Sequence, residues 1–500
     1  MKTGFRQSMA WLHAWGGLIF GWLLFAMAAT GTASVFKSEI SDWMRPEVRM
    51  RTDPVDAVAA AIRYLSVAAP ASSGWYMDAP DDRLAATIAT YDVKDANGAD
   101  EYRLAALDPV TGRPDAIRDT LGGEFFYRFH FELQLPYPWG RILASAAGML
   151  MLVVLISGIA THRRIFADFF TMRPGKGKRS WLDAHNVLGV LALPFHLMIS
   201  FTGVLTLITL TLPWAITANY GADTARAFAD LDPGYYTRPR AGRPAPLGDL
   251  RAMLTDARAR FGGDAIGRVT VENPNDAGAV LLVYRNDSNG VGYDGGVAAY
   301  DAVTGRLLSA YAEQRPAKSL YNLLYGLHMG RFAPSFSRWL YFLCGLALSA
   351  TIATGLLLWT IGREKEGGLG NAFVARFTVG ATGGLPLAMA GFFLANRILP
   401  VTLTGRQDAE VHVFFLVWGL ATLFGLLRRP ARAWIEIVAL TACAWLALPL
   451  VSAVTVGLPY DIVGLGFDGV ALALGGAFVA AIPPMLRKLR TVPKLRERRT

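Results

Sequence analysis

Long apolar runs alternate with polar segments along this chain. An α-helix needs about 20 apolar residues to cross the ~30 Å hydrocarbon core of a bilayer, and eight runs come close to that length or exceed it. They lie at residues 10–36, 140–161, 184–213, 338–361, 377–399, 411–427, 434–456 and 462–486. The pattern therefore predicts a membrane α-helical bundle of about eight spans.

Basic residues gather in every second connection between the apolar runs and at both chain ends. The positive-inside rule assigns such segments to the cytoplasm. The pattern therefore predicts a multi-pass protein of a bacterial inner membrane with both termini cytoplasmic and a basic cytoplasmic tail at 487–500. The clusters are Lys2 and Arg6; Arg163, Arg164, Arg173, Lys176, Lys178 and Arg179; Arg363 and Lys365; Arg428, Arg429 and Arg432; and seven Lys or Arg residues between 487 and 499.

Two long polar segments, about 37–139 and 214–337, interrupt the apolar pattern. The charge pattern places both on the side opposite the termini, which is the periplasm in a bacterium. Residues 280–284 have the composition of a strand, and residues 57–65 have the apolar spacing of an amphipathic helix. Each segment is therefore predicted to form a small α+β domain.

The chain contains an internal repeat. In the first and third apolar runs a histidine is followed by glycine at +4 and by Thr-Gly at +17 and +18. The residues are His13, Gly17, Thr30 and Gly31 in the first run, and His185, Gly189, Thr202 and Gly203 in the third. Residues 106–113 likewise match 299–306, each with the sequence of a tight turn after a strand.

We interpret residues 1–165 and 180–362 as two copies of one unit, which consists of a span, a periplasmic domain and a returning span. Both copies start in the cytoplasm, so this is a parallel repeat whose pseudo-two-fold axis is predicted to run along the membrane normal. Residues 377–486, with four additional spans, show no match to either copy.

Composition agrees with a membrane protein and limits the kinds of redox centre. Hydrophobic residues make up 53% of the 500 residues and charged residues 18%, with a net charge of +10, whereas soluble domains carry about 25% charged residues. The two cysteines, Cys344 and Cys443, lie inside apolar runs. Because there are only two and both lie in such runs, the sequence excludes a disulfide framework, a zinc or iron–sulfur site held by cysteines, and a C-x-x-C-H haem attachment.

Four of the seven histidines form two pairs related by the repeat. His13 and His185 open the first and third spans on the cytoplasmic side, and His130 and His328 precede the returning spans on the periplasmic side. Two imidazoles that converge from different helices suit the two axial positions of a haem iron. Zinc would need further ligands. Copper would also fit, and hydrogen bonds between helices would explain the pairs without a cofactor.

His196 is a fifth candidate ligand. It follows His185 by eleven residues, a rise of about 16 Å and about three helical turns, so in a continuous helix both would lie on one face. Pro194 precedes it and can bend the helix. A histidine at mid-bilayer is expected to be functional, either as an axial ligand in place of a symmetric partner or on the route between two haems.

Four further residues lie at predicted span ends. Arg141 and Arg338, which the repeat relates, are candidate partners for anionic haem propionates at the periplasmic edge. Anchoring at the membrane interface would explain them equally well. His162 and His412 are interpreted as interfacial side chains.

Several motifs together resemble the PepSY-associated transmembrane family. They are His-x-x-x-Gly at 13–17 and 185–189, Asp-x-x-Thr-Gly at 108–112 and 301–305, and Phe-His or Leu-His before each returning span. The resemblance covers about the first 360 residues, and the four later spans depart from the shorter four-span members. It implies PepSY-like periplasmic domains and helix histidines that hold b-type haems, as in inner-membrane ferric-siderophore reductases.

The resemblance also implies a function. We expect an oxidoreductase with two molecules of haem b per chain, which passes electrons across the bilayer to reduce a ferric siderophore or another ferric chelate. Filled axial positions favour electron transfer over binding at the iron. The cytoplasmic loops, at most about twenty residues long, contain no dinucleotide fingerprint, so the donor is expected to be separate, a quinol or a flavin protein. Membrane lipid is the other expected partner, and nucleic acid is not expected.

Two other functions fit parts of the pattern. A transporter for a siderophore or another iron complex could use the parallel repeat. It would need polar residues at the midplane, whereas Glu436 and Asp468 lie near span ends. A regulatory module without redox activity would agree with PepSY-like domains, which also occur in protease propeptides, but would leave the paired histidines unexplained.

Overall fold

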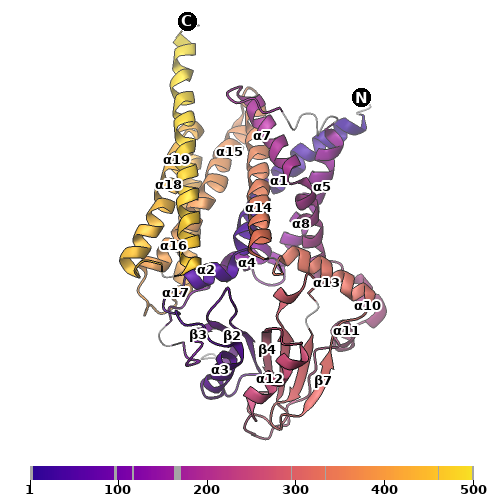
Figure 1. Cartoon of the computed structure of the whole chain (residues 1–500). Helices are drawn as coiled ribbons and strands as arrows, with labels where there is room; N and C mark the ends of the chain where they lie inside the picture. The colour runs from indigo at the N-terminus through magenta and orange to yellow at the C-terminus, as the bar shows by residue number, and fades with distance from the viewer. Residues whose placement is uncertain are drawn as a thin grey trace. The chain divides into compact units, whose positions relative to one another are not determined.

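The computed structural model describes residues 4–94, 98–114, 117–162, 171–293, 296–332, 334–459 and 461–497 (Figure 1). The chain forms two compact units. The membrane unit, as we call it, comprises Met1–Met44, Gly123–Val204 and Trp339–Thr500, and the sheet unit comprises Arg45–Gly122 and Leu205–Arg338. Of the predicted cytoplasmic basic clusters, Lys2, Arg163, Arg164, Arg498 and Arg499 lie outside the described residues.

The membrane unit is helical. Among the described residues, seven helices are long and apolar enough to cross a bilayer, and the bent pair α7 and α8 makes an eighth span if it counts as one. This agrees with a multi-pass membrane protein. The seven are α1 (Phe5–Ser34), α5 (Trp139–Thr161), α14 (Ser335–Arg363), α15 to α16 (Leu369–Ile398), α17 (Arg406–Leu427), α18 (Pro430–Thr455) and α19, which runs from Ile462 to Glu497 and so includes most of the basic tail. Two shorter helices are α2 (Lys37–Trp43) and α4 (Gly123–Glu132).

The third predicted span is broken. Helices α7 (Lys178–Leu191) and α8 (Leu193–Thr206) meet at an angle of 68°. Pro194 in the first turn of α8 has no backbone N–H, and its ring clashes with the carbonyl four residues earlier, so a straight helix cannot pass through it. The expected common face of His185 and His196 requires a continuous helix, which the structure does not have.

A π-helical turn, Val379–Gly383, joins α15 to α16. Such turns widen the helix locally and often lie at functional positions. Helix α17 approaches closely at this turn, because a Cβ on Gly380 would overlap the backbone of Thr422. Trp418 on α17 donates its indole N–H to the Ala381 carbonyl at 2.9 Å. The turn therefore serves the packing of α16 against α17.

Buried charges connect α16 and α17 to the end of α2. Arg406 and Glu410, both fully buried, form an ion pair on α17. Asn396 donates to Glu410 Oε1 at 2.9 Å. Arg397 donates to the Trp43 carbonyl at 2.6 Å, and its guanidinium lies 3.5 Å from the centre of the Trp43 ring. Buried charges require such partners, so this network anchors the C-terminal helices on α2.

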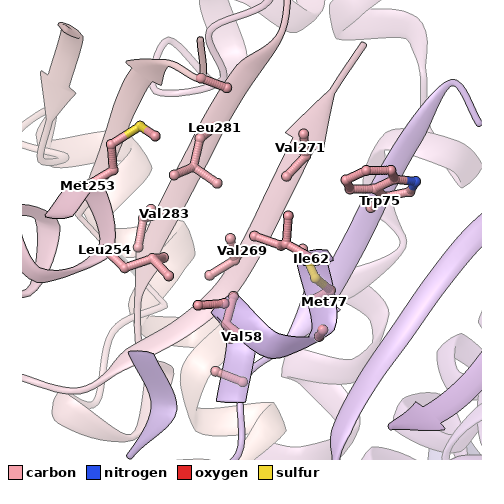
Figure 2. Close-up of a cluster of buried hydrophobic side chains, with 14 of the residues drawn as sticks. Val58, Ile62, Trp75, Met77, Met253, Leu254, Val269, Val271, Leu281 and Val283 are labelled. Carbon is pink, nitrogen blue, oxygen red and sulfur yellow. The ribbon is translucent and has the colours of Figure 1, made fainter. Parts of the chain in front are cut away.

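The sheet unit contains one antiparallel sheet of seven strands in the order β3-β2-β1-β4-β5-β6-β7. Side chains of α3 and α12, such as Ile62 and Leu254, pack with Trp75, Val271 and Val283 of the strands to form the core (Figure 2). The strands are β1 (Gly74–Asp78), β2 (Thr87–Lys94), β3 (Asp100–Leu107), β4 (Ile266–Glu272), β5 (Val280–Arg285), β6 (Val297–Asp301) and β7 (Leu307–Tyr311). The helices are α3 (Pro54–Ala68), α9 (Ile208–Thr211), α10 (Trp214–Tyr220), α11 (Thr224–Leu231), α12 (Leu250–Arg260), η1 (Asp287–Asn289) and α13 (Pro316–Met329).

The two polar segments share this sheet instead of forming the two separate domains that the sequence predicts. Strand β1 of the first segment pairs antiparallel with β4 of the second, with Trp75 opposite Val271. The pairing covers an edge that each half would otherwise expose. The first segment also contributes less than predicted, residues 45–122 instead of 37–139, because α2 and α4 belong to the membrane unit.

Both predicted turns are present in the sheet unit. Gly112 and Gly305 have φ values of 74° and 77°, which glycine adopts most readily. Each donates its N–H to the carbonyl of the aspartate four residues earlier, Asp108 at 2.8 Å and Asp301 at 2.9 Å. The second turn leads into β7, but no strand follows the first turn in residues 108–114 and 117–122.

Candidate functional site

Two histidines from different helices meet inside the membrane unit. The rings of His13 on α1 and His185 on α7 have centroids 6.2 Å apart and planes inclined at 72°. Both side chains are half-buried. The structure therefore brings together the first of the two histidine pairs that the sequence singles out.

Each of these rings is held by a backbone carbonyl. His13 Nδ1 lies 2.8 Å from the Val154 carbonyl on α5, and His185 Nδ1 lies 2.9 Å from the Thr351 carbonyl on α14. A carbonyl only accepts, so Nδ1 of each ring carries the proton and donates it. In that tautomer the lone pair is on Nε2, which can bind a metal.

A glycine lies against each ring, four residues after the carbonyl that accepts the hydrogen bond. A Cβ on Gly158 would be 2.9 Å from His13 Cε1, and a Cβ on Gly355 would be 3.2 Å from His185 Cε1. Sequence reasoning missed both glycines. The signal was available as Ser-Gly at 157–158 and Thr-Gly at 354–355, which resemble the Thr-Gly pairs already noted in the first and third spans.

His130 on α4 has the same environment. Its Nδ1 lies 2.6 Å from the Met27 carbonyl on α1, and a Cβ on Gly31, four residues later, would be 2.6 Å from the same nitrogen. This contact gives the Thr30-Gly31 pair of the sequence motif a structural reason. The phenylalanines of α4 pack on the C-terminal helices, with the rings of Phe125 and Phe392 stacked 4.8 Å apart.

His196 on α8 is completely buried, and neither of its ring nitrogens forms a hydrogen bond. The backbone of Cys344 approaches the ring but does not complete a hydrogen bond of normal geometry. A buried imidazole has both a donor and an acceptor to satisfy, and leaving them without partners costs free energy. His196 is therefore a strong candidate for contact with a bound group.

The other predicted residues are distributed over both units. His328 lies at the end of α13 in the sheet unit, so its pairing with His130 of the membrane unit stays a prediction. His162 caps the C-terminus of α5, and His412 on α17 is exposed.

The two predicted propionate partners have neighbours within the protein. Arg141 forms an ion pair with Glu132 at 2.5 Å, and its guanidinium lies 5.4 Å from the centre of the Tyr137 ring. Arg338 donates to Ser335 Oγ at 3.3 Å. Their role toward a haem stays a prediction, and a propionate at Arg141 would have to share it with Glu132.

The fold and the histidine geometry define a multi-pass membrane protein that presents paired imidazoles between its spans. The family model of the PepSY-associated transmembrane region matches residues 10–361, and the chain belongs to this family. It is also 27% identical over 324 residues to the uncharacterized protein PA4219 of Pseudomonas aeruginosa, an alignment that covers 61% of this chain and 79% of that protein. Helices α15 to α19 lie beyond the family match.

Proposed function

We propose that this protein is a di-haem oxidoreductase of the inner membrane that passes electrons outward to a ferric siderophore or another ferric chelate. The His13–His185 pair carries the proposal. A metal–imidazole bond is about 2 Å long and the ring centre lies roughly 1 Å beyond the nitrogen, so two axial imidazoles on one iron have centres about 6 Å apart. The observed separation of 6.2 Å fits this arrangement.

Several buried polar atoms on α8, on α14 and on α5 or at its C-terminal end have no hydrogen-bond partner, which also fits a bound cofactor. Such atoms are rare, because each costs about 1–3 kcal/mol. They are both ring nitrogens of His196, Trp359 Nε1, Ser145 Oγ and His162 Nδ1. One turn from His13, a Cβ on Gly17 would meet no atom within 4 Å, so there is open space on that side of α1. These residues fit haem b, which His13 and His185 would hold.

The second haem is assigned to His130 and His328, with His196 as the alternative ligand. The parallel repeat supports this assignment. His13 and His185 use the same kind of carbonyl and the same following glycine, and His130 repeats the scheme with Met27 and Gly31. Thr202-Gly203 is the corresponding pair in the second copy of the sequence.

When bound, haem would supply one-electron transfer, and His13 and His185 would hold it. The residues of the chain orient the ligands. The carbonyls of Val154 and Thr351 fix the protonated nitrogen and the plane of each ring. Leu18 and Leu356 belong to an apolar cluster at the same spans, which would make that part of the lining apolar.

The family resemblance suggests a ferric complex as the electron acceptor. The charge pattern suggests that electrons move outward, from the cytoplasmic to the periplasmic side. Hard oxygen donors prefer ferric iron, so reduction weakens the hold of a siderophore on its metal. The electron donor is a separate quinol or flavin protein.

Reporter fusions after Ala71 and after Asp264 should both be exported, because both positions lie in the sheet unit. A cytoplasmic result for either would contradict the proposed direction.

A transporter for an iron complex is the second candidate, and the broken span favours it. Discontinuous helices with polar groups near the midplane are typical of substrate sites in transporters. The break between α7 and α8 lies four residues before the buried His196. The transporter hypothesis predicts that the protein moves the iron complex across a membrane, and it does not require bound haem.

The decisive experiment is anaerobic reoxidation. Purified protein is reduced chemically, a ferric siderophore is added, and the haem α-band is followed while a chelator traps ferrous iron. We expect reoxidation with ferrous iron in proportion to the haem content, about half as much per protein in His185→Ala, which should lose one of two haems, and an unchanged amount in His412→Ala. A colourless protein that moves iron complexes into vesicles would favour the transporter. Haem that stays reduced with ferric chelates but is reoxidised by a quinone would reassign the protein to quinone-linked electron transfer.

A further inference from the structure

One face of α14 carries a regular series of residues beside the histidine pair. Thr351 accepts the hydrogen bond of His185, and Gly355 lies against its ring. Trp359 and Arg363 follow at the same interval of four residues. Residues four apart lie on one face of a helix, about 6 Å apart along its axis. Each step of four residues also turns about 40° around the helix, so Trp359 and Arg363 lie about one and two turns beyond Gly355 and progressively around the helix from it.

Trp359 presents a buried donor that has no acceptor. Its side chain is 9% exposed, and its Nε1 is buried without a hydrogen-bond partner. The ring packs with Leu18 and Leu356. An indole N–H can only donate, and leaving it unpaired away from water destabilises the protein. The geometry calls for an acceptor that the described side chains do not supply.

Arg363 brings a positive charge to the same place. Its guanidinium lies 4.1 Å from the centre of the Trp359 ring and 5.4 Å from that of Trp15. The two indole rings are 5.8 Å apart and inclined at 78°. Stacking of this kind orients a guanidinium while its N–H groups, which lie in its plane, can still donate. A buried neutral donor beside an oriented cation is suited to a carboxylate.

We propose that Trp359 Nε1 and Arg363 bind the carboxylates of the cofactor held between His13 and His185. This inference rests on the proposed function, which places haem b at that pair. Haem b has two carboxylates, and Trp359 and Arg363, about one and two turns beyond Gly355 on α14, are the residues that would hold them there. The site is additional to Arg141 and Arg338, which the sequence assigns to the periplasmic edge.

The test compares haem with haem dimethyl ester, whose carboxylates are uncharged. Full-length protein produced without haem is titrated with each, and the Soret band gives both affinities. We expect wild type to prefer haem, and this preference to fall about tenfold in Arg363→Gln and measurably in Trp359→Phe, because a charge-assisted hydrogen bond is lost. Trp359→Phe keeps the aromatic packing, and Arg432→Gln, at an exposed site on α18, is the matched control.

A second readout uses the loaded protein. Loss of a nearby positive charge disfavours the reduced haem, so Arg363→Gln should lower one haem midpoint potential, while Arg432→Gln should leave both unchanged. A wild-type protein that binds no haem overturns the proposed function itself. Haem binding with the same discrimination against the ester in wild type, Trp359→Phe and Arg363→Gln overturns only this inference.

Discussion

Gly158 on α5 lies directly against the ring of His13, where a Cβ would be 2.9 Å from the ring carbon Cε1 and 3.1 Å from Nδ1. Real Cβ atoms rarely approach other atoms so closely. The glycine therefore fixes how near α5 comes to the imidazole, and with it the hydrogen bond from Nδ1 to the Val154 carbonyl. Gly355 has the same relationship to His185.

Replacing Gly158 by valine should disturb ligation without removing a ligand. The new methyl groups would push the His13 ring off the Val154 carbonyl, so we expect a severalfold loss of the low-spin signal of one haem in electron paramagnetic resonance spectra. Gly419→Val on α17 is the control, because a Cβ there meets no atom within 4 Å. An undiminished low-spin signal in Gly158→Val would contradict the role assigned to the glycine.

Two substitutions distinguish between the candidate ligands of the second haem. If His130 and His328 form the pair, His328→Ala should lose one low-spin haem by the pyridine-haemochrome assay, whereas His196→Leu should retain two. The opposite result, one haem lost in His196→Leu and none in His328→Ala, would transfer the ligand role to the buried His196. Retention of two unchanged haems in both variants would remove both histidines from the site.

The C-terminal helices should depend on their buried ion pair. Glu410→Leu leaves the fully buried Arg406 without its carboxylate, and breaking such a pair costs about 3–5 kcal/mol. Denaturation of the protein in detergent should show this loss. Glu436→Leu, which breaks the more exposed pair with Arg428, should cost about 1 kcal/mol or less. Equal losses in the two variants would argue against an anchoring role for the buried network.

Acid stability should depend on Glu313 in the sheet unit. Hydrogen bonds from Arg315 lower the pKa of Glu313 from 4.5 to about 2. A lowered pKa in the folded state stabilises the protein above pH 4.5, and this contribution disappears as the pH falls through about 2. Arg315→Gln should therefore reduce the unfolding free energy at pH 7, by on the order of 1 kcal/mol after solvent screening, and flatten its pH dependence between those values. Parallel pH profiles for variant and wild type would contradict this.

Hydrophobic periodicity was sufficient to predict the spans. The runs are long, and the bilayer sets a minimum length, so each predicted span coincides with a helix or with the bent pair. Several ends differ by more than a turn, since one helix begins at Leu369 instead of 377 and α8 ends at Thr206 instead of 213. The bend at Pro194 could be suspected but not measured from sequence, because its angle depends on how α7 and α8 pack. The seven-stranded sheet could not be predicted either. Its central pairing joins Trp75 to Val271, residues almost two hundred positions apart.

The candidate site was partly accessible from the sequence. The repeat identified His13 and His185 because identical spacing in two copies is a strong signal, and the structure brings these two rings together. The carbonyl acceptors could not be identified, since any backbone carbonyl looks the same in a sequence. The unpartnered indole N–H of Trp359 was also invisible, because it depends on the absence of an acceptor in three dimensions.

The most direct test of the account is the haem content of the purified protein with and without the His13–His185 pair. Wild type should contain two low-spin b-type haems by pyridine haemochrome and electron paramagnetic resonance. His13→Ala and His185→Ala should each lose the same one, and His412→Ala, at an exposed site on α17, should keep both. Two unchanged low-spin haems in His13→Ala and His185→Ala, or no haem in the wild type, would contradict the central claim.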